Sequence, residues 1–333
     1  MSIAIRRTAS AWSVIPLLLW ALSATAGNRS AALEADIERI AKPIGGVTGV
    51  AAFRLDGKGQ PISVHGDEAF PLASSFKIAV AGTVLSQVDA GALRLEQMVE
   101  VDPDRHVASE VIADRFIHPG VSLSVQNLME LMLTQSDNTA TDVLMELAGG
   151  PAAITAWVRK QGVDDFRVDR DTAGILRDFF GLPQGPFNEV LMAAAKADPS
   201  LLGKASQPNP AYDDDPRDTA TPLGAARLLE RIFSGKALSP ASTDILVETM
   251  KRCRTGNDRI RGRLPVGTVV ADKTGTAGGS VNDIGVIWLP GDAGQLALAV
   301  FIKKSAVPFA ERERVIAEIA RSVRDYYLYD DTP

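Results

Sequence analysis

The chain has 333 residues, of which 46% are hydrophobic, and a formal net charge of −6 at pH 7. This length allows a sizeable buried core in one large or two moderate domains, and the acidic balance argues against nucleic acid as a partner. The single cysteine, Cys253, cannot close an intramolecular disulfide, and three histidines with none at ligand spacing give little support for zinc chemistry.

The first residues have the pattern of an export signal. Arg6 and Arg7 precede an apolar run, Trp12–Leu22, that is followed by small residues up to Ala26. We expect a signal peptide over residues 1–26 and hence a periplasmic or secreted protein with no stable membrane anchor. An uncleaved anchor is the alternative, but the run is shorter than the roughly 20 apolar residues of a spanning helix. The export route stays open.

After this segment the pattern predicts a helix, two strands and then a series of helices. Apolar residues at helical spacing predict a helix over Ala31–Ala41, and Gly45-Gly46 ends it before a strand, Val47–Leu55. Asp56-Gly57 then turns the chain into a second short strand. Helical spacing follows in four segments: Phe70–Val88, Val125–Thr134, Thr139–Leu147 and Pro151–Gln161.

The periodicity breaks down between Arg170 and Asp218, where glycines and prolines interrupt it. We expect a long loop over residues 170–218 that holds one helix, Asn188–Ala197; loops of this length are more often functional or disordered than neutral. The later expected helices are Leu223–Phe233, Pro240–Arg252 and Ala310–Tyr327, and the later expected strands are Thr268–Ala271, Val281–Leu289 and Gln295–Ile302.

Strands at both ends of the chain with helices between them predict an α/β fold combined with an all-α part. We expect an antiparallel sheet flanked by helices and built from both termini, with an inserted helical subdomain. The α/β subdomain is placed in residues 27–68 and 219–333, and the helical subdomain in residues 69–218. Clefts favour the junction of two such units, so we expect a cleft there.

Ser74 and Lys77 form the first candidate pair for catalysis. They lie three residues apart at the start of the long expected helix, which places the amine one turn above the hydroxyl on the same face. A serine alcohol needs a base, and a partly buried lysine with a lowered pKa can serve as one. The helix N-terminus would stabilise negative charge on an attacked carbonyl oxygen. The spacing alone is weak evidence, because most such pairs lie on solvated helix faces.

Two polar triplets are candidates for the same cleft. Ser136-Asp137-Asn138 falls between two expected helices, where a turn can present a hydroxyl and an amide, or where one of its residues simply caps the next helix. Lys273-Thr274-Gly275 ends an expected strand. Its glycine would let a substrate lie close to the strand edge, and the plainer alternative is a strand end with a solvated lysine.

In this order, on a helix start, a loop and an edge strand, the three elements together are far more specific than any one of them. With them the chain resembles the class A β-lactamases, whose motif set penicillin-binding proteins share. The matching stretches are Phe70–Lys77, Gln135–Thr141, residues 215–222 and Ala271–Thr276, and the resemblance covers nearly the whole mature chain. It implies a serine hydrolase that opens β-lactam rings and needs no metal or organic cofactor, because acyl transfer uses only side chains and water.

The resemblance also implies catalytic roles for the matching residues. Ser74 would form the acyl-enzyme, Lys77 would share in activating it, and Ser136 would relay a proton to the departing ring nitrogen. Asn138 would hold the amide side chain of the substrate. The backbone N–H groups of Ser74 and Thr276 would form the oxyanion hole.

A carboxylate-binding site is implied as well. Lys273, Thr274 and Thr276, together with Gly275, would bind the substrate carboxylate at the strand. Arg259, in the stretch 255–261, resembles the arginine that some class A members place behind this site. The alternative is a surface arginine on a connection between a helix and a strand.

The long loop departs from the class A pattern. Class A enzymes carry a glutamate there that activates the deacylating water, whereas this loop is longer by roughly thirty residues than the family pattern. The corresponding position holds Thr172 when counted forward from Asp169-Arg170 and Gln184 when counted back from residues 187–189. The other candidates in the loop are Asp171, Asp178 and Glu189 as bases and Asn188 as a loop contact.

Two alternative functions stay open because of this loop. One is a D-alanyl-D-alanine peptidase or esterase that acylates Ser74 and deacylates slowly, and the other is a non-catalytic sensor of β-lactams or peptidoglycan. In each case we expect a small β-lactam or a cell-wall peptide as the bound molecule, no nucleic-acid partner and a monomer.

Overall fold

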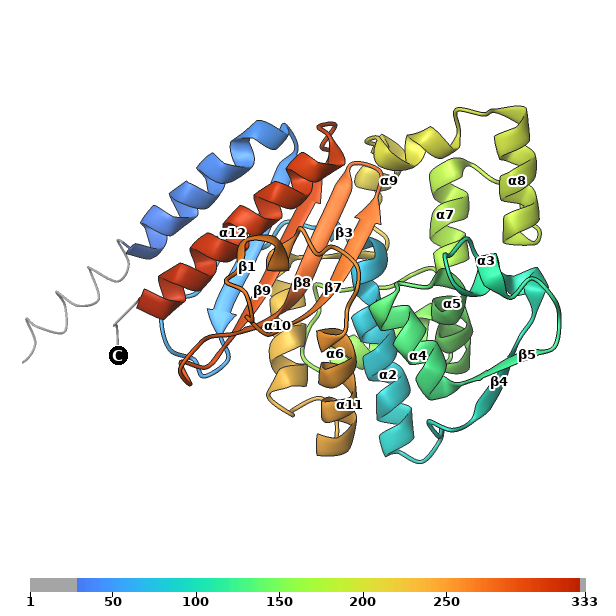
Figure 1. Cartoon of the computed structure of the whole chain (residues 1–333), viewed down its shortest axis with the longest axis horizontal. Coiled ribbons are helices and arrows are strands. Elements are labelled where there is room, and N and C mark those ends of the chain that lie inside the picture. The colour runs from blue at the N-terminus through green and yellow to red at the C-terminus, as the bar shows by residue number, and fades with distance from the viewer. Residues whose placement is uncertain (1–28, 330–333) are drawn as a thin grey trace, which may run out of the picture.

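A five-stranded antiparallel sheet in the order β2-β1-β9-β8-β7 forms the centre of the molecule (Figure 1). The computed structural model describes residues 29–329, so the expected signal peptide lies outside them. The strands are β1 Val47–Arg54, β2 Ile62–Val64, β7 Val270–Ala277, β8 Ser280–Trp288 and β9 Gln295–Lys303. The sheet therefore joins the first and last parts of the chain, which confirms the predicted fold class.

Helices cover both faces of this sheet. The helix over residues 29–41 and α12, Phe309–Tyr329, lie side by side on one face (Figure 1). Helix α10, Pro222–Phe233, packs on the other face. Successive strand residues such as Val50 and Ala51 belong to opposite cores, because side chains alternate along a strand. Burial on both faces explains why the strands are almost continuously hydrophobic.

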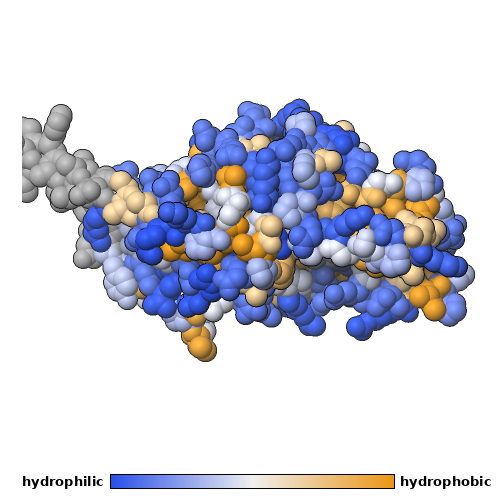
Figure 2. Space-filling view, turned by 90° about the horizontal axis from the view of Figure 1, so that it is seen from above, coloured by the Kyte–Doolittle hydropathy of each residue, from blue (hydrophilic) through white to orange (hydrophobic). Residues whose placement is uncertain are grey.

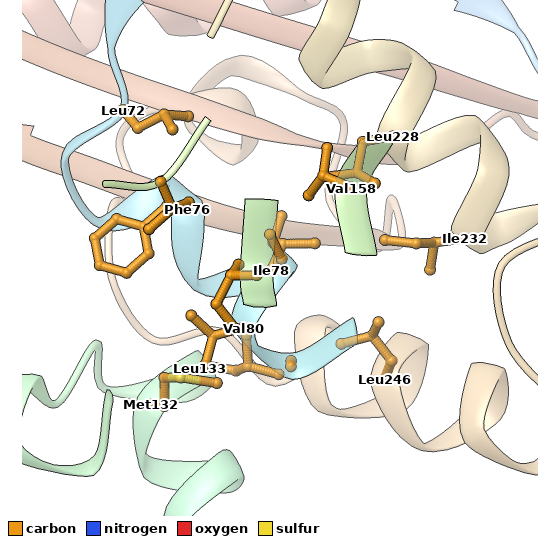
Figure 3. Packing of buried hydrophobic residues seen from close by; sticks show 14 of the residues in the cluster. Leu72, Phe76, Ile78, Val80, Met132, Leu133, Val158, Leu228, Ile232 and Leu246 are labelled. Carbon is orange, nitrogen blue, oxygen red and sulfur yellow. The ribbon is translucent and has the colours of Figure 1, made fainter. Parts of the chain in front are cut away.

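A helical body lies beside the sheet and surrounds one central helix (Figure 1). Its helices are α2 Lys77–Asp89, α4 Val125–Thr134, α5 Asn138–Leu147 and α6 Pro151–Lys160, and α11 Pro240–Lys251 packs against them. Helix α2 is buried all round from Lys77 to Leu85, as expected for a helix without a polar face. Figure 3 shows the side chains that meet there, among them Ile78, Val80, Leu133, Val158 and Leu246.

The predicted start of the long helix is wrong. Phe70–Pro71 form a short strand, β3, paired with β6, Thr219–Ala220, and a 3-10 turn, η2, Ala73–Phe76, comes before α2. The N–H of Leu72 donates to the carbonyl of Asp218 at 2.9 Å. Pairing with a distant segment therefore overrides the local helical spacing, and Ser74 lies on the 3-10 turn rather than at the tip of the α-helix.

The predicted end of the strand that carries the third motif is also wrong. Strand β7 begins at Val270 and continues to Ala277, so Lys273-Thr274-Gly275 lies inside the strand. The β7–β8 pairing extends to Ala277 opposite Ser280, which keeps the strand regular past the motif.

The segment 170–218 is helical rather than a loop with one helix. It contains α7 Thr172–Phe180, α8 Phe187–Ala197, η4 Leu202–Ser206 and α9 Pro210–Asp213, of which α8 corresponds to the expected helix. The Asp171 side chain caps α7 by accepting from the N–H of Gly174 at 2.7 Å, and Gly181 ends the helix in the left-handed conformation. Buried Ala173, Phe187, Leu191 and Leu201 form a small core with Val107, which keeps these helices together.

The remaining short elements connect these parts. They are η1 Lys42–Ile44, β4 Met98–Val101, η3 Pro103–Arg105, α3 Ile112–Arg115, β5 Val121–Ser124 and η5 Ile260–Arg263. Among residues 29–329, no helix combines the length and the apolar character needed to cross a membrane. The face seen in Figure 2 is mostly hydrophilic, with hydrophobic residues in scattered small groups.

Candidate active site

Ser74 lies on the turn that joins β3 to α2. Ala73 before it has a left-handed backbone with φ of 44°. Asn282 of β8 is fully buried and donates from Nδ2 to the carbonyls of Pro71 at 2.8 Å and Leu72 at 3.1 Å. A positive φ at a residue other than glycine persists only where the surroundings determine it. Tertiary contacts therefore set the position of Ser74, and sequence reasoning had not identified Asn282.

The three motif elements meet at the hydroxyl of Ser136. Lys77 Nζ donates to Ser136 O at 2.7 Å and to Asn138 Oδ1 at 2.8 Å, and it lies 3.2 Å from Ser136 Oγ. Lys273 Nζ donates to the same Oγ at 3.0 Å. Three segments that are far apart in the sequence thus converge on one side chain.

The other two residues of the Ser136 turn fix its shape. Asp137 caps α5 through a hydrogen bond of 2.8 Å, and its second oxygen accepts from the N–H of Ile112 at 2.9 Å. Asn138 donates from Nδ2 to the carbonyl of Ala108 at 2.7 Å. The capping alternative is therefore correct for Asp137, whereas the side chain of Asn138 contacts Lys77.

Strand β7 lies at the sheet edge beside the turn that carries Ser74. Lys273 is fully buried, so the solvated-lysine alternative is wrong, and its Nζ also donates to Thr274 O at 2.9 Å. A Cβ on Gly275 would lie 2.6 Å from the carbonyl oxygen of Leu72. Glycine at this position thus allows the turn to lie directly against the strand. Thr276, the next residue, is exposed.

Arg259 is buried behind Thr276, so the surface-arginine alternative is wrong. Only 3% of Arg259 is exposed. Its guanidinium donates to Thr276 Oγ1 at 2.7 Å, to the carbonyls of Gly275 at 3.1 Å and Asn282 at 2.8 Å, and it pairs with Glu313 at 3.1 Å. These contacts fix Gly275 and Thr276, near the end of β7, on the side of the strand that faces Arg259.

Burial changes the protonation of both lysines. Burial, and next the charge of Lys273, holds the pKa of Lys77 well below its usual value. Burial also lowers the pKa of Lys273 to about 8. Because the two amines share Ser136 Oγ, a charge on Lys273 disfavours a second charge on Lys77, which favours Lys77 as the amine that accepts a proton. One amine is then a base and the other a cation for an anionic substrate group.

None of the loop carboxylates named above forms a hydrogen bond or ion pair with this cluster among the described residues. Asp171 is exposed and caps α7, and Asp178 pairs with Arg170 at 2.5 Å and Arg217 at 3.0 Å. Glu189 is exposed in the first turn of α8. Gln184 is also exposed, and within residues 29–329 no hydrogen bond joins Asn188 to Ser74, Lys77, Ser136 or Lys273. The structure therefore brings together the three motifs and Arg259, but it does not bring these loop residues to them.

Thr172, at one of the two glutamate positions, is held by a residue that sequence reasoning had missed. Asp142 of α5 accepts from the N–H groups of Thr172 at 2.7 Å and Ala173 at 2.9 Å. Thr172 is 6% exposed. Asp142 lies four residues after Asn138 on the same helix, a spacing that could have marked it as a neighbour of the site.

A salt bridge closes the segment 170–218 at its base. Arg170 Nε donates to Asp218 Oδ2 at 2.6 Å, and the other oxygen of Asp218 accepts from the N–H groups of Asp169 at 2.7 Å and Arg170 at 3.0 Å. Asp218 is 2% exposed. The two ends of the extended segment are therefore fixed to each other, next to the strand that precedes Ser74.

Comparison with known proteins agrees with this geometry. The profile described as "Beta-lactamase enzyme family" matches residues 32–327. The chain is 32% identical to the extended-spectrum beta-lactamase PER-1 of Pseudomonas aeruginosa over 90% of this chain and 89% of that protein. It is 33% identical to the beta-lactamase CTX-M-25 of Escherichia coli over 86% of each.

Solved structures give the same result. The chain is similar to the last common ancestor of Gram-negative bacteria class A beta-lactamase, with a TM-score of 0.73 and 34% identity over 89% of this chain and 99% of that one. It is also similar to a beta lactamase from Xanthomonas campestris, with a TM-score of 0.74 and 32% identity over 89% of this chain and 98% of that one. The fold, the converging motifs and these similarities together show that the chain belongs to class A of the β-lactamase enzyme family.

Proposed function

We propose that the protein hydrolyses β-lactams through an acyl-enzyme on Ser74. The observation that carries this proposal is the Ser136 hydroxyl, which lies 3.2 Å from Lys77 Nζ and 3.0 Å from Lys273 Nζ, with the motif strand packed on the turn of Ser74. The similar proteins are β-lactamases by name, which supports the same class of reaction.

In the acylation step the neutral Lys77 amine accepts the proton of Ser74 Oγ, and Oγ attacks the lactam carbonyl carbon. The N–H groups of Ser74 and Thr276 stabilise the oxyanion. As the C–N bond breaks, Ser136 gives its hydroxyl proton to the ring nitrogen and regains one from the Lys77 ammonium. Ser74 then carries an ester and Lys77 is neutral again.

Deacylation again needs a proton acceptor, because a water must lose a proton as it attacks the ester. Asp171 and Asp178 are engaged elsewhere, and within residues 29–329 no hydrogen bond or ion pair joins Glu189 to the cluster. We therefore assign this proton to the Lys77 amine, which returns it to Ser74 Oγ when the ester bond breaks. The product carboxylate is released, and the enzyme regains its starting state.

The substrate carboxylate would be bound by the Lys273 ammonium and by the hydroxyls of Thr274 and Thr276. Arg259 acts on this group through Thr276 Oγ1, its direct partner at 2.7 Å. Asn138 would hold the amide side chain of the substrate. Asn188, the loop residue expected to contact the substrate, forms no hydrogen bond with the motif residues among residues 29–329.

Incubation with a chromogenic cephalosporin tests the function. We expect steady turnover by the parent protein, a mass increase on Ser74 that disappears with product formation, and loss of both in Ser74→Ala. The control Ser63→Ala, at an exposed position of β2, should keep full turnover. A single stoichiometric burst with a persistent adduct would instead support the slow peptidase or esterase, and unchanged activity in Ser74→Ala would exclude every mechanism through this serine.

We further propose export to the periplasm or the medium after cleavage behind Ala26, a monomeric state and no stable membrane anchor. The signal-peptide pattern at residues 6–26 supports this location. Cell fractionation with N-terminal sequencing should find a mature protein that begins at Gly27, and light scattering should give the mass of one chain. The division into residues 27–68 with 219–333 and residues 69–218 also stays a proposal.

A further inference from the structure

A cavity of about 520 Å³ lies between α5, the segment 104–107 and the helices α7 and α8. None of Ser74, Lys77, Ser136 or Lys273 is among the residues that line it. Its volume is in the range of about 300–1,000 Å³ that is typical of small-molecule sites. The proposed reaction does not use this cavity.

The floor of the cavity is apolar and well ordered by packing. Val107, Val143, Met145, Ala173 and Phe187 line it, and each is at least 92% buried. These side chains come from the segment before α3, from α5, from α7 and from α8. The floor can therefore receive an apolar group and exclude water from it.

The charged groups around the cavity are unevenly balanced. Four carboxylates face two guanidinium groups, and the six residues are Asp104, Asp142, Glu146, Asp171, Arg105 and Arg177. Arg105 pairs with Glu146, and Arg177 donates to the carbonyl of Gly185 at 2.6 Å. Within residues 29–329 no ion pair with a lysine or arginine involves the other three carboxylates.

Asp142 is the carboxylate that most lacks a counter-ion. Its two oxygens accept from the backbone N–H groups of Thr172 at 2.7 Å and Ala173 at 2.9 Å, and among residues 29–329 no lysine or arginine forms an ion pair with it. Burial, and next the charge of Asp171, raises the pKa of Asp142 to about 7. A carboxylate in this setting is stabilised by any cation that reaches the cavity.

We propose that this cavity binds an organic cation with an apolar body and that Asp142 is its counter-ion. The apolar floor takes the body, and the excess of negative charge at the walls selects against anions. A bare metal ion fits less well, because among residues 29–329 no three His, Cys, Asp or Glu side chains are placed together to hold one.

Occupancy of the cavity also acts on the segment next to the active site. A bound cation favours the ionised form of Asp142, which is the form that accepts both N–H groups at the start of α7. The same helix, α5, carries Asn138 one turn earlier. Binding therefore strengthens the hydrogen bonds between α7 and α5, the helix whose Asn138 contacts Lys77.

Benzyltrimethylammonium, a permanent cation, is the probe for calorimetric titration of the purified protein, with phenylacetate as an anion of similar size. We expect the cation to bind at pH 8 and the anion not to bind. Affinity for the cation should fall about tenfold from pH 8 to pH 6 as Asp142 gains its proton. The other charged groups near Asp142 come from four elements. They are Asp171 and Arg177 at the start and in the body of α7, Glu146 of α5, Asp104 and Arg105 of η3, and Lys77 of α2.

Variants separate the contribution of Asp142 to cation binding from the contributions of these neighbouring charges. Asp142→Asn should weaken binding at pH 8 at least tenfold and remove the pH dependence, and Val143→Phe, which fills the floor with an apolar group, should abolish binding while Asp142 stays in place. Asp114→Asn, an exposed carboxylate of α3 that does not line the cavity, is the matched control and should bind as the parent does. Melting curves show that each variant is folded. Equal binding of the two probes, parental binding by Val143→Phe, or a pH dependence that survives Asp142→Asn would overturn the proposal.

Discussion

Ser136 shows at the scale of one residue how the site is held. Its φ of 58° lies in the left-handed region, which costs a residue other than glycine about 1–2 kcal/mol. The strained turn persists because Asp137 caps the next helix on one side and Lys77 binds the carbonyl of Ser136 on the other. The result is a hydroxyl that faces two amines at once.

The protonation of Lys273 predicts the alkaline limit of activity. Its pKa is lowered to about 8 by burial, so its ammonium is present below that pH and is lost above it. Since the proposed substrate is an anion, kcat/KM should fall as the pH rises through about 8, and this parameter reports the free enzyme. A pH profile with an anionic cephalosporin measures it.

The matched variant is Lys273→Arg. A guanidinium keeps its charge at every accessible pH, so the alkaline limb should move upward even if the overall rate is lower. An alkaline limb that stays at the same pH in this variant would show that another group titrates there.

Among the elements, the segment 170–218 contains Thr172 and Gln184, the two positions at which the class A pattern leads one to expect a glutamate. The side chain of Asp171 caps α7, and the small core around Phe187 packs the helices of the segment together. The salt bridge between Arg170 and Asp218 joins the two ends of the segment. The segment is therefore a structured part of the molecule, which a stretch rich in glycine and proline does not reveal.

Removal of Arg170 should destabilise the protein strongly. Arg170→Ala leaves Asp218 buried without its cation, and breaking a buried pair in this way costs about 3–5 kcal/mol. Urea unfolding measures the change. Arg39→Ala breaks an exposed pair with Asp36 on the first helix and should change stability by less than about 1 kcal/mol. Similar values for the two variants would show that the Asp218 contact is unimportant.

The carboxylates of this segment should not matter for hydrolysis of the acyl-enzyme. We expect single changes Asp171→Asn, Asp178→Asn and Glu189→Gln to leave the decay of the Ser74 adduct close to the parental rate. Mass spectrometry of the adduct over time measures the decay. A general base contributes about 10²–10⁴-fold, so a loss of that size in one variant would identify it as the missing base and refute our assignment to Lys77.

The contact between β7 and the turn of Ser74 sets the spacing between that strand and that turn. A Cβ at position 275 would lie 2.6 Å from the Leu72 carbonyl, so Gly275→Ala must push the strand and the turn apart. Displacement of about 1 Å can cost about 10²-fold in rate, so we expect a large fall in kcat/KM from a protein that still folds. Gly203→Ala in η4, where an added Cβ meets nothing within 4 Å, should retain activity. Parental kcat/KM in Gly275→Ala would mean that this contact does not position Ser74.

At the scale of the whole molecule, the sheet connects two large cores. One core lies under α12 and the helix over 29–41, and the other surrounds α2 and reaches the turn of Ser74. Both use the same strands, because alternate residues face opposite sides. A substitution that destabilises one core should therefore also destabilise the other, because both cores share β1, β8 and β9.

Unfolding should accordingly be a single transition. Leu298→Ala, in the core under α12 and separated from the strand of Lys273 by β8, removes a fully buried side chain and should cost about 2–5 kcal/mol. We expect the urea midpoint measured by far-UV circular dichroism and the midpoint measured by loss of turnover to move down together. Leu202→Ala, at a side chain that is 51% exposed, is the control. Separate midpoints would show that the two cores unfold independently.

The sequence by itself determined the elements with strong periodicity and the residues with motif spacing. Strands with near-continuous hydrophobic residues and helices with a buried face carry their pattern locally, so the sheet, α4, α5, α6, α10, α11 and α12 were predictable. Ser74, Lys77, the Ser136 turn and the Lys273 strand followed from three spaced motifs whose combination is specific.

Tertiary structure alone decided the start of α2, the helices of the segment 170–218, the burial of Lys273 and Arg259, and the contacts of Asp142 and Asn282. In each case the deciding partner is distant in the chain: Asp218 for Leu72, Val107 for Phe187, Ser136 for Lys273, Thr276 for Arg259, Thr172 for Asp142 and Pro71 for Asn282. Local patterns cannot encode such partners, because burial and long-range hydrogen bonds depend on which surfaces the completed fold brings into contact.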